Sequence, residues 1–481
     1  MRSSGSVESS QACKTGPTGG SERVKPLGTA GERSTTLARD QGGTYEEGGL
    51  LLERVLERGN FVRALKRVEQ NRGSAGVDGM GVEELRAYLP EHWLELRERL
   101  LGGTYEPSAV RRVEIPKPEG GKRRLGIPTV LDRFLQQALL QVLTPLFEPD
   151  FSESSYGFRP GRSAHGAVEV ARGYVREGYR WVVDVDLEKF FDRVNHDRLM
   201  ARVALKVKDK RVLGLIRRYL ESGVMVDGVV VDAAEGTPQG GPLSPLLSNV
   251  YLDELDKELE RRGHKFCRYA DDCNIYVRSW RAGERVMASV RGFVTCRLKL
   301  KVNEAKSAVG RPWERKFLAF SLLPQKEAKI RIAPRSLERL KGRLRELTRR
   351  NRSQELGERI RLINAYVGGW VGYFAKAETP SVLERLDKWL LRRLRACVWK
   401  TWKRVRTRYH KLRSLGLPEN VVGYMANTRK GPWRIAGSPP LQQGLSKAYW
   451  KGLGLIGLLE RYHQMRNTWR TAGCGPARPV V

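Results

Sequence analysis

Three aspartates stand at positions where they could hold metal ions. Asp186 ends the mostly apolar segment 181–185, so a strand formed by this segment would place its carboxylate at a sheet edge, where a cation can bind. Asp271 and Asp272 are adjacent and have apolar or aromatic residues on both sides; paired acids in a hairpin are unfavourable unless a cation compensates them. Two Mg²⁺ ions held by three carboxylates can activate a 3′-hydroxyl, stabilise an in-line transition state and neutralise a leaving pyrophosphate. Taken alone, the Asp271-Asp272 pair is more typical of a polar turn.

A Gly/Pro-rich segment lies between the two carboxylate elements. Residues 235–245 read Glu-Gly-Thr-Pro-Gln-Gly-Gly-Pro-Leu-Ser-Pro and would form a turn that opens a helix. Such a turn lets the backbone approach a nucleotide or a template closely. An ordinary loop followed by a helix cap has the same composition, so this segment alone does not decide between the two.

Alternating strands and helices must position these residues. Short apolar runs predict strands at 181–186, 266–269 and 274–277, and spacings of three and four predict helices at 196–207, 245–261 and 282–299. Earlier in the chain, the pattern predicts helices from residue 50 and over 131–146, and two strands around a turn within 111–128. From residue 336 onward the spacing is helical almost throughout. We therefore expect an α/β or α+β catalytic domain followed by a helical region.

Length and composition limit the class of protein. The chain has 481 residues, 40% of them hydrophobic, and a net charge of +34, which indicates about two to four domains, a buried core and an anionic partner. The first 44 residues are rich in Gly, Ser and Thr, so residues 1–48 are expected to be a flexible leader. The chain has neither an apolar run long enough to span a bilayer nor a secretory signal, and its six cysteines are too scattered for a zinc ribbon. We expect a soluble, intracellular protein without a membrane partner.

The positive charge is concentrated late in the chain. Residues 331–481 hold 33 Lys and Arg against nine Asp and Glu. Within them, Leu391–Arg413 contains ten basic residues and no acid, with Trp399, Trp402 and Tyr409 interleaved. Basic groups neutralise phosphates and aromatic rings stack on bases, so this composition favours RNA or single-stranded DNA binding. The alternative is a solvated basic helix face.

The strand-end aspartate, the Pro-Gln-Gly loop and Tyr269-Ala270-Asp271-Asp272 together resemble the palm of reverse transcriptases. Residues from about 50 to 470 are similar to bacterial group II intron reverse transcriptase/maturases of the compact form without an endonuclease. The blocks that carry this resemblance begin at Ile115, Ser155, Leu300, Gly369 and Asn427: IPKPEGGKRRLGIP, SYGFRPGRSAH, LKVNEAKS, GWVGYF and NTRKGPWR.

The resemblance implies an α+β, right-hand polymerase fold with an α-helical thumb. On this basis the chain would divide into an N-terminal extension and fingers at 49–180, a palm at 181–330, a helical thumb/maturase domain at 331–412 and a small basic DNA-binding region at 413–481. It also implies an RNA-directed DNA polymerase that is a splicing maturase and supports intron mobility. Its partners would be group II intron RNA, an RNA template/primer duplex, target DNA and dNTPs. The protein would lie in the cytoplasm, associated with the nucleoid in bacteria.

The resemblance also assigns roles to residues. Asp186, Asp271 and Asp272 would be catalytic and would ligate two Mg²⁺ ions, replaceable by Mn²⁺, with the Leu187 carbonyl as an additional ligand. The residues implied to bind the incoming nucleotide are Lys117, Arg123, Phe191 as the gate against a ribose 2′-hydroxyl, Gln239, and Lys306 beside pyrophosphate. The residues expected to contact nucleic acid are Arg159, Arg392, Arg393, Arg395, Lys400, Lys403, Arg404, Arg429, Lys430 and Arg434.

Each of these residues has an ordinary structural alternative. Phe191 could be a core aromatic, Lys117 and Arg123 could be surface charges of a hairpin, and Arg159 could form a structural ion pair. Gln239 could simply cap the next helix.

Two positions depart from the family pattern. Ala319 stands where glycine is common and would cost little, whereas Gly368 replaces a common arginine and would remove a phosphate contact.

Two other functions stay open. One is an RNA-binding maturase whose polymerase has decayed, which the intact acids argue against. The other is a domesticated polymerase in DNA repair or defence, which would keep the same site.

Overall fold

The computed structural model describes residues 50–116, 121–226, 229–231, 235–237, 240–351 and 354–471. All of these residues fall within one compact unit, Glu47–Val481. The predicted leader at 1–48 lies outside the described residues. Among the described residues, no helix is both long and apolar enough to cross a bilayer.

The N-terminal part is helical and carries one long hairpin, as the sequence predicts. The first elements are α1 (Leu51–Leu56), α2 (Arg58–Asn71), α3 (Val82–Leu101), β1 (Val110–Pro116), β2 (Lys122–Ile127), α4 (Val130–Phe147), the short 3₁₀ helix η1 (Glu148–Asp150) and α5 (Ala164–Arg176). Thr129 caps α4 by accepting the backbone N–H of Asp132, the usual role of threonine at this position. Strands β1 and β2 pair antiparallel, with Ile115 opposite Arg123.

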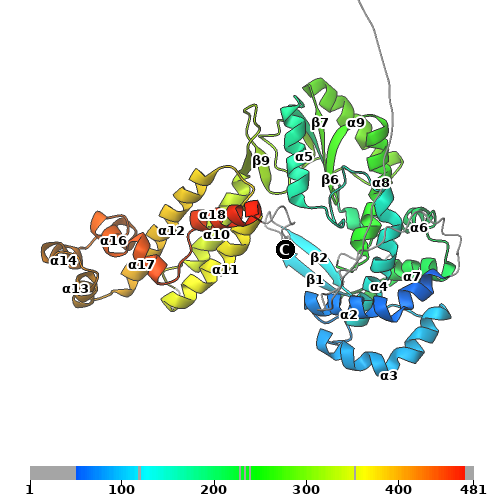
Figure 1. Cartoon of the computed structure of the whole chain (residues 1–481), viewed down its shortest axis with the longest axis horizontal. Helices are drawn as coiled ribbons and strands as arrows, with labels where there is room; N and C mark the ends of the chain where they lie inside the picture. The colour runs from blue at the N-terminus through cyan, green and yellow to red at the C-terminus, as the bar shows by residue number, and fades with distance from the viewer. Residues whose placement is uncertain are drawn as a thin grey trace, which may run out of the picture. The chain divides into compact units, whose positions relative to one another are not determined.

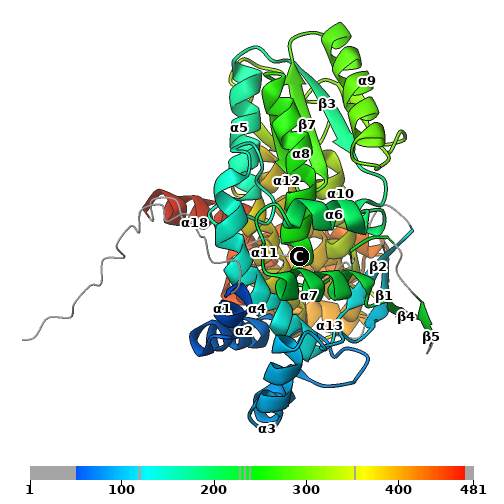
Figure 2. The same ribbon diagram turned by 90° about the vertical axis from the view of Figure 1, so that its right-hand side faces the viewer.

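A four-stranded antiparallel sheet, here called the central sheet, holds the aspartates. Its strands are β3 (Trp181–Asp186), β6 (Lys265–Tyr269), β7 (Asp272–Val277) and β8 (Ala308–Gly310), in the order β6-β7-β3-β8. Helices α5, α8 (Ser244–Arg261) and α9 (Trp280–Cys296) pack against its strands (Figures 1 and 2). The strands and helices predicted around the three acids are therefore confirmed.

Shorter elements complete this region. They are η2 (Phe190–Asp192), α6 (His196–Val203), α7 (Lys210–Glu221), β4 (Val224–Val226), β5 (Val229–Val231), β9 (Phe320–Leu322) and β10 (Ile330–Ile332). Strands β4 and β5 extend the N-terminal hairpin into a second sheet, β2-β1-β4-β5, and β9 pairs with β10. The second sheet therefore joins strands more than 100 residues apart in the chain.

The rest of the chain is helical, as the spacing after residue 336 predicts. Its helices are α10 (Pro334–Leu347), α11 (Leu356–Phe374), α12 (Pro380–Thr401), α13 (Val405–Ser414), α14 (Glu419–Ala426), α15 (Pro432–Ile435), α16 (Pro439–Gly444), α17 (Lys447–Gly452) and α18 (Leu458–Thr471). The prolines at the start of α10, α12, α15 and α16 suit the first helical turn, whose N–H groups have no partner within the helix.

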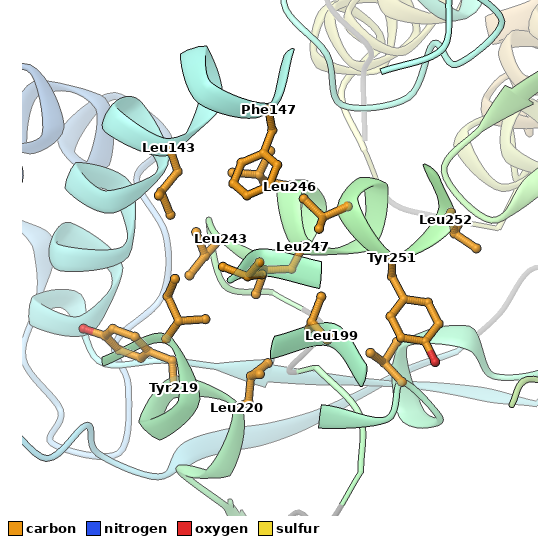
Figure 3. Packing of buried hydrophobic residues seen from close by; sticks show 14 of the residues in the cluster. Leu143, Phe147, Leu199, Tyr219, Leu220, Leu243, Leu246, Leu247, Tyr251 and Leu252 are labelled. Atoms are coloured by element: carbon orange, nitrogen blue, oxygen red, sulfur yellow. The ribbon is translucent and has the colours of Figure 1, made fainter. Parts of the chain in front are cut away.

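Two hydrophobic clusters hold these elements together. The first joins the N-terminal helices to one side of the central sheet and includes Leu143 and Phe147 of α4 and Leu246 and Leu247 of α8, which converge in Figure 3. The second joins α5, Val182 and β9–β10 to the helices from α10 onward. Because the second cluster runs continuously from α5 to α18, residues of the central sheet and of the helical region share one core.

Candidate active site

The central sheet brings the three predicted aspartates together. Asp186, the last residue of β3, is the direct register partner of Asp272, the first residue of β7, and directly opposed residues on antiparallel strands project from the same face. Asp271 lies in the turn between β6 and β7, where Ala270 has a left-handed backbone (φ +57°). All three acids line one cleft of about 860 Å³. The predicted carboxylate cluster is therefore present in the fold, although its residues lie up to 86 positions apart in the chain.

A fourth aspartate, Asp184, lines the same cleft, as does Glu314, and neither was predicted. Asp184 lies two residues before Asp186 on β3, and this period-two spacing on a strand was the signal that could have revealed it. Arg315 holds Asp184 through two contacts, Nε at 3.0 Å and Nη2 at 2.8 Å from Oδ2. Burial nevertheless raises the pKa of Asp184 above its ordinary value. The cleft thus contains more negative charge than the sequence indicated.

This crowding changes the titration of Asp272. Burial, together with the charges of Asp184, Asp271 and Asp186, raises the pKa of Asp272 to about 7. The four aspartates of this partly buried cleft repel one another, and only a cation or a proton can relieve that repulsion. The electrostatics of the cleft therefore favour binding of a positive ion.

The donor set fits divalent magnesium. Carboxylate oxygens are the ligands that Mg²⁺ prefers. In the described part of the chain the buried Oδ2 of Asp186 has an ion pair with the Lys306 ammonium at 3.2 Å but no well-aligned hydrogen bond. Over the described residues, no group of three or more ligating side chains is already closed around one point. Asp186, Asp271 and Asp272 would thus hold the metal ions after local adjustment.

Backbone contacts fix the position of Asp186. Its N–H donates to Ser307 Oγ at 2.9 Å, and its carbonyl accepts from the N–H of Asn303 at 2.8 Å. Both partners belong to the predicted 300–307 block, which also carries Lys306. Leu187 follows directly and its side chain is buried in the core, so the metal role predicted for its carbonyl stays a prediction.

Phe191 lines the cleft together with the four aspartates. It belongs to η2, and its ring meets that of Phe190 edge to face, with centroids 5.1 Å apart. The Gly/Pro-rich loop runs directly past it, because the N–H of Thr237 donates to the Phe191 carbonyl at 2.7 Å. Phe191 therefore borders the cleft that holds the aspartates, and its role as a steric gate stays a prediction.

Several predicted nucleotide contacts cannot be placed. Lys117 and Gln239 lie outside the described residues, and so does the side chain of Arg123. The neighbouring backbone is described: Gly240 packs against the β2 strand so closely that an added Cβ would lie 2.5 Å from the Gly126 carbonyl oxygen. This contact explains the glycine, since no other residue fits there.

Arg159 is held in a buried ion pair, and its predicted contact with a template stays a prediction. Its side chain is buried and forms an ion pair with Glu148 at 2.9 Å. It also donates to the Ser155 carbonyl at 2.9 Å and to the Ser152 carbonyl. The alternative of a structural ion pair is the one that the geometry supports. The adjacent Phe158 is instead exposed, with a left-handed backbone, and lines the cleft.

Part of the basic segment on α12 also serves the fold. Arg395 is buried and its Nε donates to the Leu445 carbonyl at 3.0 Å, a structural role, and its contact with nucleic acid stays a prediction. Arg393 donates to Thr348 Oγ1 at 2.6 Å, and burial lowers the pKa of both arginines. Arg392 donates to the Trp433 carbonyl and stacks over the Trp433 ring at 4.4 Å. These arginines attach α12 to neighbouring helices.

Trp399 and Trp402, expected to stack on bases, are buried in the second cluster. Six of the predicted basic residues remain exposed, and their side chains have no hydrogen bond or ion pair with any residue that the structure describes. These are Lys400, Lys403, Arg404, Arg429, Lys430 and Arg434. The candidate nucleic-acid surface is thus smaller than predicted. It consists of these six exposed cations and does not include Trp399 or Trp402.

Ala319 is strained, contrary to the expectation that it costs little. Its φ is +68° and that of Leu318 is +50°, a region that costs a non-glycine residue about 1–2 kcal/mol. Both residues line the cleft. Gly368, the second departure from the family pattern, has open space where a side chain would begin.

Basic residues of the cleft wall were also missed. Lys316, Arg331, Arg335 and Arg339 line it together with Trp313. They come from the loop after β8, from β10 and from α10. Each is an isolated basic residue in a chain rich in arginine, so the sequence did not indicate that they line the cleft. The cleft therefore has an acidic floor, formed by Asp184, Asp186, Asp271 and Asp272, and a basic wall, formed by Lys316, Arg331, Arg335 and Arg339.

Comparisons with known proteins agree with this geometry. Residues 115–322 match the family described as "Reverse transcriptase (RNA-dependent DNA polymerase)" and residues 337–416 match "Group II intron, maturase-specific domain". The acidic floor lies within the first match, and most of α10 and all of α11, α12 and α13 lie within the second. Neither matched description is that of an endonuclease.

Two curated relatives are informative. Protein YkfC of Escherichia coli is 36% identical over 274 residues, 49% of this chain and 71% of YkfC. The group II intron-encoded protein LtrA of Lactococcus lactis is 38% identical over 208 residues, 43% of this chain but only 34% of LtrA. Among solved structures, the partial Cas6-RT-Cas1–Cas2 complex is 27% identical, covering 51% of this chain and 42% of that one, with a TM-score of 0.34. The chain belongs to the group II intron reverse transcriptase/maturase family, with a reverse transcriptase domain followed by a maturase domain.

Proposed function

We propose that this chain copies RNA into DNA at the acidic cleft, using Asp186, Asp271 and Asp272 to hold two Mg²⁺ ions. The observation that carries this proposal is the register pairing of Asp186 with Asp272 beside Asp271, in a cleft where the pKa of Asp272 is raised to about 7. Metal ions held there would supply charge neutralisation at the reacting phosphate. The central sheet would act as the palm, with the hairpin of β1 and β2 as part of the fingers and α10–α12 as the thumb.

Side chains around the acids would take distinct roles. Phe191 would exclude the 2′-hydroxyl of a ribonucleotide, and Lys306, released from Asp186 when a metal ion binds, would assist the leaving pyrophosphate. The basic wall of Lys316, Arg331 and Arg339 would hold the phosphates of a template/primer duplex.

We also propose that the chain binds its own group II intron RNA as a splicing cofactor and supports intron mobility into target DNA. The maturase-specific match and the similarity to an intron-encoded protein support this role. The exposed cations Lys400, Lys403 and Arg404 at the end of α12, with Arg429, Lys430 and Arg434, would contact phosphates. A protein in this role would work in the cytoplasm near the nucleoid.

Two experiments test these roles separately. If the chain is a polymerase, the protein should extend a DNA primer on an RNA template with dNTPs and Mg²⁺. If it is also a splicing maturase, it should accelerate splicing of the RNA surrounding its gene at low Mg²⁺. Extension without any effect on splicing would favour a domesticated polymerase, while faster splicing without extension would favour a maturase whose polymerase has decayed.

A further inference from the structure

Arg268 is the second-last residue of β6, just before the turn of Ala270 and Asp271 that leads into Asp272. It is 1% exposed and its ion-pair partner Asp256, on α8, is 0% exposed. A guanidinium group has five N–H donors in a fixed plane. Here each donor has an acceptor, and the acceptors come from three separate segments of the chain.

Two of these segments are rigid supports. Nε donates to Asp256 Oδ1 at 2.7 Å and Nη2 donates to Oδ2 of the same carboxylate. Nη1 donates to Asn249 Oδ1 at 3.0 Å, also on α8, and Nη2 donates to Ser155 Oγ at 2.8 Å. The guanidinium plane is thus fixed on α8 and on the segment before Gly157.

The fifth contact reaches the turn itself. Nη1 of Arg268 donates to the carbonyl of Ala270 at 3.0 Å. Ala270 has φ +57°, a left-handed conformation that a non-glycine residue keeps only when its surroundings enforce it. The next two residues are Asp271 and Asp272, so the peptide that Arg268 holds sets the direction of both carboxylates.

Gly157 holds the turn from the other side. A Cβ at Gly157 would lie 2.3 Å from the backbone nitrogen of Ala270, so the two backbones are in direct contact. Asn249, which accepts from Arg268, donates through Nδ2 to the Gly157 carbonyl at 2.8 Å. The N–H of Tyr156 donates to the Arg268 carbonyl at 2.8 Å, and the N–H of Arg268 donates to the Ser154 carbonyl at 2.9 Å. Arg268, Asn249 and Gly157 therefore form one connected support.

We infer that Arg268 is a positioning residue for metal binding: with Asn249 and Gly157 it holds Ala270 in a strained turn, so that Asp271 and Asp272 face the cleft. A buried ion pair is seldom more stabilising than apolar packing, so stability alone does not account for the Arg268–Asp256 pair. Because every donor of Arg268 is used and one of them holds the strained Ala270 peptide, we infer that the pair fixes the conformation of this turn. The same support is continuous with Phe158, whose ring lies 6.2 Å from that of Tyr269. The inference rests on the proposed polymerase function for its kinetic readout only.

The test compares Arg268→Lys with a matched control, Arg198→Lys. Arg198 also forms a two-point ion pair with α8, to Glu254 at 3.0 and 2.9 Å, but does not touch the turn. Lysine keeps the charge and loses the planar fork. We expect Arg268→Lys to lower kcat by about 10- to 100-fold, as a small misplacement of catalytic groups does, and to weaken Mn²⁺ binding, measured by electron paramagnetic resonance without turnover. Arg198→Lys should leave both within about twofold.

A second change separates positioning from stability. Glycine adopts the left-handed conformation without strain, so adding Ala270→Gly to Arg268→Lys should restore part of the Mn²⁺ affinity and of kcat. If Arg268→Lys does not fold, Asn249→Asp takes its place, because aspartate still accepts from Arg268 but cannot donate to the Gly157 carbonyl.

Three results would overturn the inference. They are a loss of thermal stability without change in Mn²⁺ affinity or kcat, equal effects of the Arg268 and Arg198 variants, and no rescue by Ala270→Gly. If the wild-type protein bound Mn²⁺ but extended no primer, the polymerase function would fail, whereas the difference in Mn²⁺ binding between the two variants would still decide the inference.

Discussion

Replacing Asp272 by asparagine should stabilise the metal-free protein at neutral and alkaline pH. Burial and the charges of Asp184, Asp271 and Asp186 raise the pKa of Asp272 from 3.8 to about 7. Above pH 7 the folded protein must therefore keep an unfavourable negative charge in the cleft. Asparagine has nearly the same shape and removes that charge.

The sign and size of the effect follow from proton linkage. Between about pH 4 and 7 the folded protein retains a proton that the unfolded chain has released, so this group lowers stability as pH rises and reaches its full cost above pH 7. The difference between 3.8 and about 7 corresponds to about 4 kcal/mol. Asp272 is partly exposed, so solvent screening reduces this value, and we expect about 2–4 kcal/mol.

The assay is thermal or denaturant unfolding of wild type and Asp272→Asn from pH 5 to 8.5, with EDTA or with MgCl₂. In EDTA the variant should be the more stable protein at pH 8, and its advantage should shrink steadily from pH 7 toward pH 5, because the folded and unfolded chains differ in protonation only between about pH 4 and 7. Mg²⁺ should stabilise wild type more at pH 8 than at pH 6, because a protonated carboxyl competes with the metal, and should stabilise the variant little. A variant that is less stable than wild type at pH 8 in EDTA, or an advantage independent of pH, would refute the reasoning.

Three further outcomes are expected. Phe191→Ala should reduce discrimination against ribonucleotides by about 10- to 100-fold, measured by single-nucleotide incorporation of dNTP and rNTP; unchanged discrimination would make Phe191 a core residue only. Replacing Lys400, Lys403 and Arg404 together by glutamine should weaken RNA binding and reduce the slope of log K against log salt by about 2, measured by filter binding, while a slope equal to that of wild type would exclude these side chains as phosphate contacts. Ala319→Gly should raise the free energy of unfolding by about 1 kcal/mol, measured in a urea titration, and a loss of stability would show that the left-handed backbone is not strained.

The parts of the site that could be predicted from sequence depend on local patterns. An apolar run that ends in Asp186, and an aromatic strand interrupted by Asp271 and Asp272, determine both the strands and the place of the acids on them. Because β3 and β7 pair in register, those two local patterns combine into one cluster. Phe191 lies in the same cleft because it is only five residues beyond Asp186.

The parts that could not be predicted depend on packing between distant segments. Arg395 is buried because the residue at 445 comes to lie against α12, and no property of the 391–413 segment indicates this. Arg159 and Arg268 carry the same charge as exposed arginines, yet partners at Glu148 and Asp256 decide that they are structural. Asp184 is paired with Arg315, 131 positions later. Composition identifies a basic or aromatic segment, but tertiary contacts decide which of its side chains face solvent.

Primer extension on an RNA template, by wild type and by a variant with Asp271→Ala and Asp272→Ala, tests the central claim most directly. With dNTPs and Mg²⁺, wild type should extend a DNA primer, and the variant should fold, bind the duplex and add no nucleotides, because its remaining acids, Asp184 and Asp186, lie on one strand only. Extension by the folded variant at the wild-type rate would contradict the assignment of this cleft as the polymerase centre.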